Sequence, residues 1–392
     1  MITLQIIFWI CIIALFHSYL GYPIFLYLIV LFKGPKKFNT YLKTEKLPKI
    51  TILMAAFNEE AVIEKKIRTI FKTTYPAHLI EVLIGSDNSN DNTNTIIDKL
   101  SEELPQLQIR KFTERQGKVN IINQLSERAA GEIIFITDAN VLFDESTLFE
   151  VVKYFADEQI GLVDTHMTNY GIKKDGISFQ EKSYISREVY VKNLESKAFG
   201  TMIGPFGGCY AIRKELFVKV PSNYLVDDFF ICMNVLSKNK KSINNLDAVV
   251  YEDVSNVLSI EFNRKIRIAI GNFQNLLHFK KILYKPFSPL GFSFISHKVL
   301  RWFGPFFLLA AFISNLLLIQ HSNWYVYLLI IQLSITFLPI ADIILKMFGI
   351  HIVLLRFATH FYTMNLSLLI GFVKSLKGVK SNVWKPTKRF QG

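Results

Sequence analysis

Cysteine is scarce in this chain of 392 residues, which contains only Cys11, Cys209 and Cys232. These three cysteines do not have the paired spacing of a zinc site or of a small disulfide-stabilised domain. The sequence also lacks the glycine motifs GxGxxG and GxxxxGK[ST]. A disulfide framework, a zinc site, a dinucleotide dehydrogenase and a P-loop NTPase are therefore disfavoured.

Charged side chains are missing from Ile2–Phe32, a segment long enough to cross a bilayer with some tilt. The features of a secretory signal peptide are missing too, namely a basic start, a short apolar core and a small-residue cleavage site. We therefore expect residues 1–33 to form a retained transmembrane anchor.

Acidic residues are missing after Asp342, although the chain as a whole carries a net charge of +13. The tail is instead basic, with Lys374, Lys377, Lys380, Lys385, Lys388 and Arg389. Because this charge lies beside apolar segments, anionic lipids and the positive-inside rule explain it better than nucleic acid does. We expect a lipid bilayer as partner and no nucleic acid.

Three further apolar stretches, Trp302–Gln320, Trp324–Leu345 and Ile350–Phe372, lie toward the C-terminus. The first two are good candidates for membrane spans. The third contains polar side chains that are costly in hydrocarbon unless they face protein or the membrane interface. These are Arg356, His360 and Asn365.

The distribution of lysines predicts the topology. Lys33, Lys36 and Lys37 follow the first apolar segment and place the central region in the cytoplasm. Two C-terminal spans keep the basic tail inside, whereas three export it, so we prefer two, with Ile350–Phe372 in the interface or re-entering. We thus expect an integral protein of the cell (inner) membrane with a cytoplasmic catalytic domain. Its C-terminal membrane region is 301–373 (two or three spans), followed by a cytoplasmic tail at 374–392.

Between these ends, at 45–258, buried-strand patterns alternate with amphipathic helical patterns. One helix is predicted directly after Asn58, which would cap it, and others at Thr95–Leu104 and Val119–Ala130. The alternation predicts an α/β fold, an open parallel sheet with helices on both faces. The expected strands are Lys49–Phe57, Ile80–Ser86, Gln108–Phe112 and Ile133–Thr137.

Polar residues follow the predicted strands, at the edge where open α/β sheets bind ligands. They are Asn58, Asp87, Lys118 and Asp138. Asn and Asp are also common in turns and helix caps, so each position alone has a purely structural explanation. All four at one edge favour a binding site.

Six sequence blocks occur in the order found in one enzyme family: ITILMAAFNEE, IGSDNSNDNT, RQGKVNIINQL, FITDANV, GPFGGCYAIRKELF and VDDFF. Over residues 48–285 the chain resembles the membrane-bound inverting glycosyltransferases of family 2, the group of the hyaluronan, cellulose and poly-N-acetylglucosamine synthases. The resemblance implies a GT-A-type, Rossmann-like open sheet domain flanked by transmembrane helices. It also implies a nucleotide-sugar donor, first of all a UDP-sugar, and a saccharide or lipid-linked acceptor.

A sugar nucleotide leaves as a diphosphate, whose developing charge a divalent cation held by carboxylates can neutralise. The resemblance implies Mg²⁺ or Mn²⁺ on Asp138 and Asn140, although the family motif usually reads Asp-x-Asp and Asn140 departs from it. It further implies nucleotide-binding roles for Asn58, Asp87, Asp91, Lys118 and Asp138. Turn formation for Asp87 and Asp91, and a solvated helix start for Lys118, are the alternatives.

Asp227 and Asp228 match the acidic pair that supplies the general base in the family, with Asp228 as the catalytic member. A base must take the proton of the attacking acceptor hydroxyl, and the like charge of a neighbour raises the pKa of a carboxyl toward that task. A helix cap before Phe229 is the alternative. Glycines allow close backbone approach to an acceptor, unless they serve a structural turn; the expected acceptor-binding set is Gly204, Gly207 and Gly208.

Residues 259–300 are predicted to form amphipathic helices at the membrane interface. Arg264 and Arg267 lie here, and Arg267 is a candidate for a phosphate contact. Strongly processive relatives carry Gln-x-x-Arg-Trp in this region. The missing tryptophan weakens the case for a long polymer product.

The first hypothesis is therefore a membrane glycosyltransferase for extracellular or cell-surface polysaccharide synthesis. A non-catalytic membrane protein that senses a nucleotide sugar or scaffolds a synthase is the alternative from another class. The acidic pair argues against it, because binding alone needs no base. A transporter is less favoured still, and the sequence specifies neither the donor sugar nor an oligomeric state.

Overall fold

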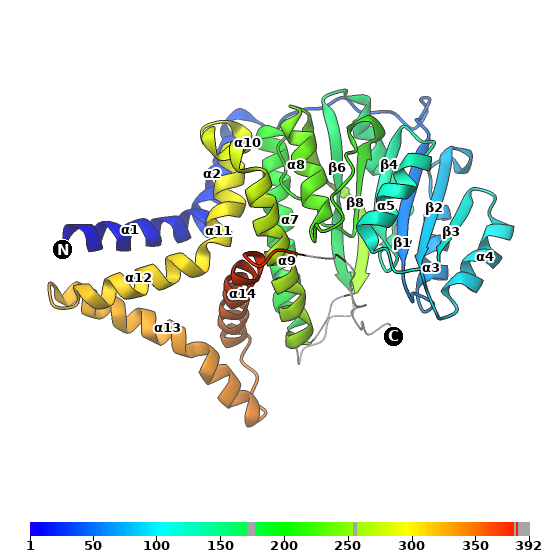
Figure 1. The fold of residues 1–392 in the computed structure, drawn as a ribbon. Coiled ribbons are helices and arrows are strands. Elements are labelled where there is room, and N and C mark those ends of the chain that lie inside the picture. Colours follow the sequence, from blue (N-terminus) through cyan, green and yellow to red (C-terminus); the bar gives the residue numbers. More distant parts are fainter. Residues whose placement is uncertain (171–176, 254–256, 380–381, 383–392) are drawn as a thin grey trace. The chain divides into compact units, whose positions relative to one another are not determined.

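Two units make up the chain in the computed structural model, which describes residues 1–170, 177–253, 257–379 and 382. The helical unit comprises Met1–Leu28, Lys173–Tyr184 and Ser255–Gly378. The sheet unit comprises Ile29–Ile172, Ile185–Val254 and Val379–Gly392 (Figure 1). Of the predicted basic tail, residues 380–381 and 383–392 lie outside the described part.

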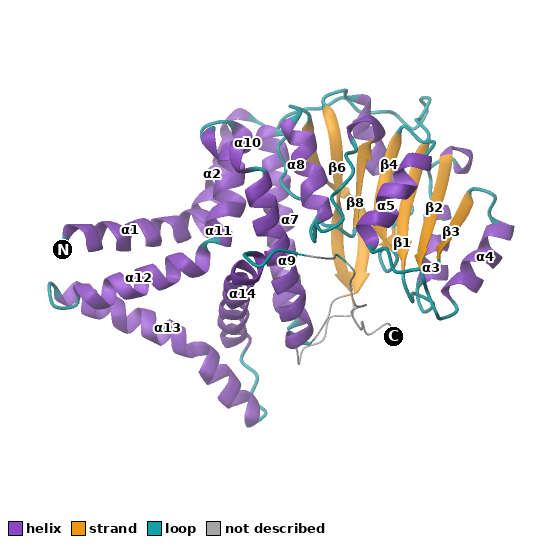
Figure 2. Ribbon diagram, viewed as in Figure 1, coloured by secondary structure: helices purple, strands orange, loops and turns teal. Residues whose placement is uncertain are grey.

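The sheet unit is built on an eight-stranded sheet with the order β3-β2-β1-β4-β7-β6-β8-β5 (Figure 2). Its first four strands are parallel, because each is separated from the next by a crossover helix. They match the predicted strands closely. Three of them are short, mostly apolar runs buried on both faces, whereas the edge strand β3 has a mixed composition. They are β1 (Ile50–Ala56), β2 (Ile80–Asp87), β3 (Leu107–Phe112) and β4 (Ile133–Asp138).

The other four strands make the sheet mixed, so the prediction of a purely parallel sheet is wrong beyond β4. Strand β7 enters at the edge where β4 ends and therefore runs antiparallel to it. It is also antiparallel to β6, β6 is parallel to β8, and β5 is antiparallel to β8. These strands are β5 (Leu142–Phe143), β6 (Ile160–Tyr170), β7 (Cys209–Arg213) and β8 (Lys241–Asp253).

Helices connect the strands, and α3, α4 and α5 are amphipathic, as the periodicity predicts. The first begins after Val62, so the prediction that Asn58 caps it is wrong. Asn58 instead has a φ of 53°, a left-handed conformation that Asn tolerates better than most residues. The helices are α3 (Ile63–Phe71), α4 (Thr93–Glu103), α5 (Lys118–Arg128), α6 (Thr147–Val152), α7 (Ser178–Phe199) and α8 (Asp227–Ser237).

The helical unit begins with two helices joined by a π-helical turn at His17–Gly21. Helix α1 packs along α12, and α14 packs along α9. The helices are α1 (Ile2–Phe16), α2 (Tyr22–Lys33), α9 (Leu258–His278), α10 (Pro289–Ser293), α11 (Leu300–Trp302), α12 (Gly304–Leu318), α13 (Asn323–Met347) and α14 (Val353–Ser375).

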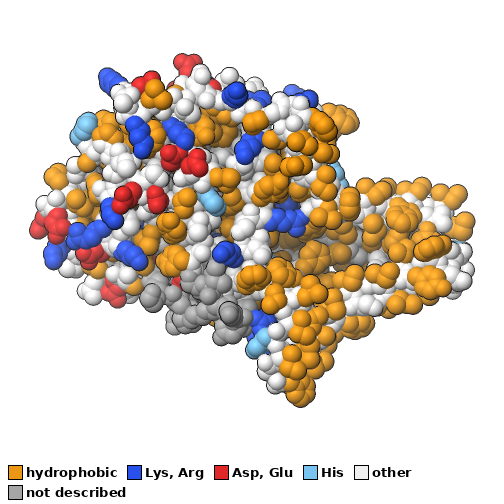
Figure 3. All heavy atoms as spheres, turned by 180° about the vertical axis from the view of Figure 1, so that it is seen from behind, with side chains coloured by type: hydrophobic (Ala, Val, Ile, Leu, Met, Phe, Trp, Pro, Cys, Tyr) orange, Lys and Arg blue, Asp and Glu red, His pale blue; other side chains and the backbone are white. Residues whose placement is uncertain are grey.

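Three helical segments of the described chain are long and apolar enough to cross a membrane: Ile2–Lys33, Asn323–Met347 and Val353–Ser375. The predicted span at Trp302–Gln320 is a helix of only 15 residues. It reaches spanning length only together with Pro289–Trp302, from which it is bent by 63°. Exposed hydrophobic side chains gather over α1, α12 and α13, whereas charged side chains are frequent over the sheet unit (Figure 3).

The polar residues of the third apolar stretch face protein. Arg356, His360 and Asn365 are all buried on α14. His360 Nε2 lies 3.1 Å from a carboxylate oxygen of Glu181, whose other oxygen accepts from Lys265 Nζ at 2.7 Å. Of the two environments that would spare these side chains the cost of hydrocarbon, the structure provides contact with protein.

Candidate active site

The predicted site residues of the sheet unit gather at one edge of the sheet. Strands β1, β2 and β4 end here, and β7 begins here because it is antiparallel to β4. Asp87 and Asp138 are the last residues of their strands, and Asn58 lies two residues beyond Ala56. The backbone topology alone therefore places the two carboxylates at the ligand-binding edge of the sheet.

Asn58 and Asp91 tie together the loops that follow β1 and β2. The Asn58 side-chain oxygen accepts from the backbone N–H of Asn90 at 3.0 Å. The Asp91 carboxylate accepts from the N–H of Glu60 at 3.2 Å and from that of Thr93 at 3.0 Å. These bonds give the two loops a fixed shape at the edge of the sheet.

Asp87 is fully buried and anchors the loop before α5. Its carboxylate accepts from the N–H of Gln116 at 2.5 Å, from that of Gly117 at 3.1 Å and from Arg115 Nε at 3.0 Å. The Arg115 guanidinium in turn lies 3.3 Å from the centre of the Phe57 ring. Asp87 thus orders the loop that leads into α5.

Lys118, the first residue of α5, reaches the end of β4. Its Nζ lies 2.6 Å from Asp138 Oδ1 and 3.5 Å from the carbonyl oxygen of Gly207. Burial acts to lower the pKa of Lys118, but the charges of Asp138, Asp227 and Asp228 outweigh burial and raise it. The charges of the two acidic sites, far apart in the sequence, therefore both act on one ammonium group.

Asp227 and Asp228 form the first turn of α8, where negative charge is favourable. The helix cap is Val226, so a capping role for the acidic pair is excluded. Asp228 Oδ1 accepts from the N–H of Phe229 at 2.8 Å. Burial, followed by the charge of Asp227, raises the pKa of the Asp228 carboxyl to about 7.

The loop before β7, residues 204–208, packs against this carboxylate and is called the glycine loop below. Its glycines allow the close approach. A Cβ atom at Gly207 would lie 2.9 Å from Asp228 Oδ2, and one at Gly208 would lie 2.5 Å from Met167 Cε. Gly204 has a φ of 70°, which other residues rarely adopt. The Gly208 carbonyl oxygen accepts from the N–H of Asp138 at 3.0 Å, so the glycine loop is fixed to the end of β4.

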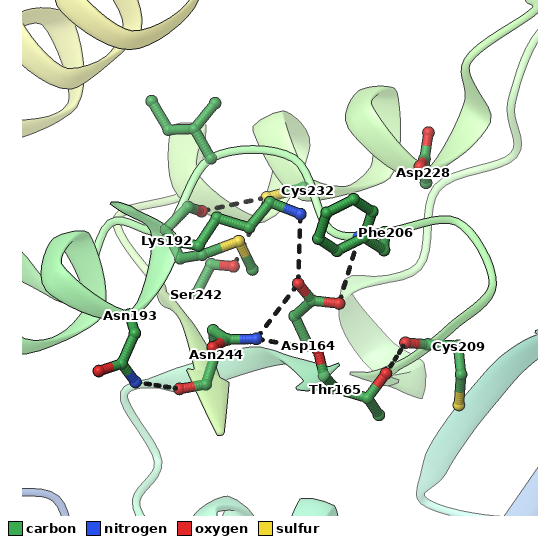
Figure 4. Close-up of polar contacts among 12 residues, drawn as sticks. Asp164, Thr165, Lys192, Asn193, Phe206, Cys209, Asp228, Cys232, Ser242 and Asn244 are labelled. Carbon is green, nitrogen blue, oxygen red and sulfur yellow. Dashed lines mark hydrogen bonds and ion pairs between the residues drawn. The ribbon is translucent and has the colours of Figure 1, made fainter. Parts of the chain in front are cut away.

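A buried charged cluster lies beneath the glycine loop (Figure 4). Asp164 on β6 is fully buried, and its Oδ2 lies 3.4 Å from Lys192 Nζ of α7 and 3.5 Å from Asn244 Nδ2 of β8. Asp164 Oδ1 accepts from the N–H of Phe206 in the loop at 3.3 Å. The ammonium of Lys192 lies 3.6 Å from the centre of the Phe206 ring. The cluster therefore contacts both the backbone N–H and the ring of Phe206.

Lys66 on α3 is a second buried lysine at the site. Its Nζ donates to Thr137 Oγ1 at 3.0 Å and lies 3.5 Å from the centre of the Phe143 ring. Thr137 Oγ1 donates in turn to the Gly208 carbonyl oxygen at 2.9 Å. Burial lowers the pKa of Lys66 to about 7, against the opposing charges of Cys209 and Asp138.

Asn140 is buried next to the end of β8. Its Nδ2 donates to Glu252 Oε1 at 3.2 Å, so its amide oxygen is the atom that it can present to a ligand. One carboxylate and one amide oxygen fit a Mg²⁺ or Mn²⁺ ion that completes its coordination with water and substrate phosphates. The described residues contain no cluster of three or more His, Cys, Asp or Glu suited to a metal.

Arg267 is the one predicted site residue that belongs to the helical unit. It lies on α9 and is exposed. The residues that the structure brings together in the sheet unit are Asn58, Asp87, Asp91, Lys118, Asp138, Asn140, Gly204, Gly207, Gly208, Asp227 and Asp228.

Sequence reasoning missed several residues that shape the site, although two of them left a signal. Lys66 is three residues from Ile63 and four from Ile70, on the apolar face of a helix where lysine is unusual. Glu252 is near the carboxyl end of a strand, as Asp138 is. Asp164 and Lys192 gave no signal, because a buried ion pair between distant segments leaves no periodic pattern.

Comparison with known proteins identifies the family of this domain. Residues 51–220 match the model of the family described as glycosyl transferase family 2, so the chain carries a domain of this family. A beta-monoglucosyldiacylglycerol synthase from Trichormus variabilis is 27% identical over 263 residues, 65% of this chain and 55% of that protein. A poly-beta-1,6-N-acetyl-D-glucosamine synthase from Staphylococcus aureus is 28% identical over 123 residues, 31% of this chain and 29% of that protein. The chain thus spans about half the length, or less, of these curated relatives.

A solved structure shares the fold over nearly the whole chain. It is a mannosyltransferase from Pyrobaculum calidifontis in complex with GDP-Man and Mn²⁺, with a TM-score of 0.69 and 23% identity. The match covers 94% of this chain and 99% of that one. The sheet unit accordingly has a GT-A-type fold, as the resemblance implied.

Proposed function

We propose that this protein is a membrane glycosyltransferase that transfers a sugar, with inversion, from a nucleotide sugar to a hydroxyl of a saccharide or lipid-linked acceptor. The proposed donor is a UDP-sugar. The observation that carries the proposal is the position of Lys118, whose ammonium lies 2.6 Å from Asp138 and 3.5 Å from the carbonyl oxygen of Gly207, the glycine that packs against Asp228. A basic group that pairs with one acidic site and contacts the loop beside the other suits a reaction with a diphosphate at one end and a nucleophile at the other.

At the donor end, the proposed diphosphate site consists of Asp138, the amide oxygen of Asn140 and Lys118. A Mg²⁺ or Mn²⁺ ion bound there would neutralise charge on the leaving diphosphate. Lys118 adds a cation of its own, and the loops of Asn58 and Asp91 form the floor for the nucleoside. Arg115, stacked on Phe57, offers a flat charged surface beside this floor.

At the acceptor end, Asp228 is the proposed general base and Asp227 its charged neighbour. The carboxylate of Asp228 takes the proton of the acceptor hydroxyl as the oxygen attacks the anomeric carbon. Gly207 leaves room for a hydroxyl next to Oδ2, because its missing side chain would stand at that position. One displacement of this kind inverts the configuration of the transferred sugar.

The apolar helices support a location at the cytoplasmic face of the cell membrane, with two or three C-terminal spans, as proposed from the lysine distribution. Relatives include a glycolipid synthase and a polysaccharide synthase. Both acceptor classes, a lipid and a growing saccharide, are compatible with a site whose product is formed beside a bilayer.

Activity should depend on pH through the proposed base. The pKa of the Asp228 carboxyl is raised to about 7, and only its ionised form accepts a proton. We therefore expect kcat/KM for transfer to fall about tenfold per pH unit once the pH drops below about 6. A flat profile of kcat/KM between pH 5 and 8, measured with a soluble acceptor, would contradict the assignment.

The proposal is tested with the full-length protein in lipid nanodiscs, incubated with a panel of radiolabelled UDP-, GDP- and TDP-sugars. We expect transfer from one donor, with activity abolished by EDTA and restored by Mn²⁺ or Mg²⁺. Sizing of the product then separates a glycolipid from a polysaccharide. Failure of every donor to yield transfer or hydrolysis, with the nucleotide still bound, would favour a non-catalytic sensor or scaffold instead.

A further inference from the structure

We propose that Glu252 is a positioning residue that fixes the side-chain amide of Asn140, so that the amide oxygen faces the Asp138 end of the site. The proposal rests on the proposed function, because the orientation of Asn140 matters when a diphosphate binds beside Asp138. It assigns a role to the end of β8, which belongs to none of the predicted motifs.

The directions and register of the strands place Glu252 at the edge of the sheet where the site lies. Strand β7 is antiparallel to both β4 and β6, and β6 is parallel to β8, so β4 and β8 run in the same direction. The carboxyl ends of β4 and β8 therefore lie at the same edge of the sheet. In the β5–β8 ladder Leu142 pairs with Tyr251 and Phe143 with Val250. This antiparallel register sets the residues just before Leu142 beside Glu252.

The chemistry of the contact determines which way the amide points. An ionised carboxylate can only accept hydrogen bonds, and an amide donates only through its nitrogen. The 3.2 Å contact with Glu252 Oε1 therefore requires Nδ2 on that side. Asn140 is only 7% exposed, which leaves its side chain little freedom to rotate. Its oxygen is then the atom presented to a ligand.

The same contact explains why an amide occupies position 140. An aspartate there would set a second carboxylate about 3 Å from Glu252 in a poorly solvated place, and like charges at this distance repel. The hydrogen bond survives if both residues change, because a glutamine at 252 donates to an aspartate at 140. The two positions should therefore behave as one amide–carboxylate pair whose members are interchangeable only together.

The experiment compares Asn140→Asp, Glu252→Gln and the double variant N140D/E252Q with the wild-type full-length protein in one detergent. Asp247→Asn is the matched control, because its carboxylate lies on the same strand but its side chain is 74% exposed. Two quantities are measured: the melting temperature without ligand, and the dissociation constant of UDP with Mn²⁺ and with EDTA. GDP is titrated in parallel, so that the result does not depend on the identity of the nucleotide.

We expect N140D to lower the melting temperature by about 5 °C, and N140D/E252Q to return it to within about 2 °C of the wild type. E252Q is expected to weaken Mn²⁺-dependent nucleotide binding about tenfold while leaving binding in EDTA unchanged, because a glutamine can donate as well as accept and no longer fixes which atom of the Asn140 amide faces the site. The double variant should recover Mn²⁺-dependent binding, and D247N should match the wild type throughout.

A wild-type melting temperature in N140D, or equal losses in N140D and the double variant, would overturn the proposal. So would unchanged Mn²⁺-dependent binding in E252Q. Failure of the proposed function gives a different result, because the wild type itself then binds neither nucleotide. In that case the melting temperatures, which are measured without ligand, still test whether Asn140 and Glu252 form a hydrogen-bonded pair.

Discussion

Replacing Asp228 by asparagine is expected to slow sugar transfer about a thousandfold, within the range for loss of a general base. The substitution keeps the shape of the side chain and an oxygen that can accept from the N–H of Phe229. It removes only the ability to take up a proton. The measurement is kcat for transfer to a soluble acceptor at pH 8, where the wild-type carboxyl is ionised.

Nucleotide binding separates this loss from a general loss of structure. The Asp228→Asn variant should bind UDP in Mn²⁺ within about twofold of the wild type, because Asp228 lies at the acceptor end of the site. Asp247→Asn again serves as the control for removal of a carboxylate. Turnover above one tenth of the wild-type value would remove Asp228 from the role of base.

Substitution of Lys192 by methionine is expected to lower the free energy of unfolding by about 3 kcal/mol, because it leaves a buried carboxylate without its partner. Asp164 is fully buried and depends on Lys192 and Asn244 for its charge to be tolerated. Burial already raises the pKa of the Asp164 carboxyl to about 6, against the charge of Lys192. Chemical denaturation of the variant in detergent measures the loss.

Two comparisons identify the cause of that loss. The double variant Lys192→Met/Asp164→Asn removes both charges but keeps an oxygen for the N–H of Phe206, so it should recover most of the stability. The penalty of K192M should also shrink between pH 7 and pH 5, because the Asp164 carboxyl then becomes neutral.

Lys219→Met removes one member of an exposed ion pair with Glu127 and should cost less than about 1 kcal/mol. Equal stability of K192M and K219M would show that the buried pair contributes nothing.

The first half of the sheet could be predicted from the sequence mainly because its central strands are nearly continuous apolar runs between turns, whereas the edge strand β3 is mixed. Ile50–Ala56 and Ile133–Asp138 are of this kind, and the polar residues after them reveal the ligand-binding edge. Resemblance to a family then supplied the acidic pair at Asp227 and Asp228, which periodicity alone does not single out. The close approach of the glycine loop to Asp228 confirms that these blocks meet at one place.

The second half could not be predicted because its strands contain buried polar residues. Strand β6 carries Asp164 and strand β8 carries Asn244, and both would count against a buried strand. Their hydrogen bonds to each other and to Lys192 offset the cost of burial, but the partners come from distant segments. A single sequence gives no sign of such pairing, and the antiparallel direction of β7 was missed for the same reason.

The attachment of the glycine loop to β4 has a thermodynamic consequence. Gly208 accepts from both Asp138 and Thr137, and Gly207 accepts from Lys118, so the backbone next to Asp228 is continuous with the groups proposed to hold the diphosphate. A ligand that moves Lys118 therefore alters the conformation of the glycine loop, next to which the acceptor hydroxyl is proposed to bind. Donor and acceptor affinities are then linked, and by reciprocity each substrate alters the binding of the other by the same factor.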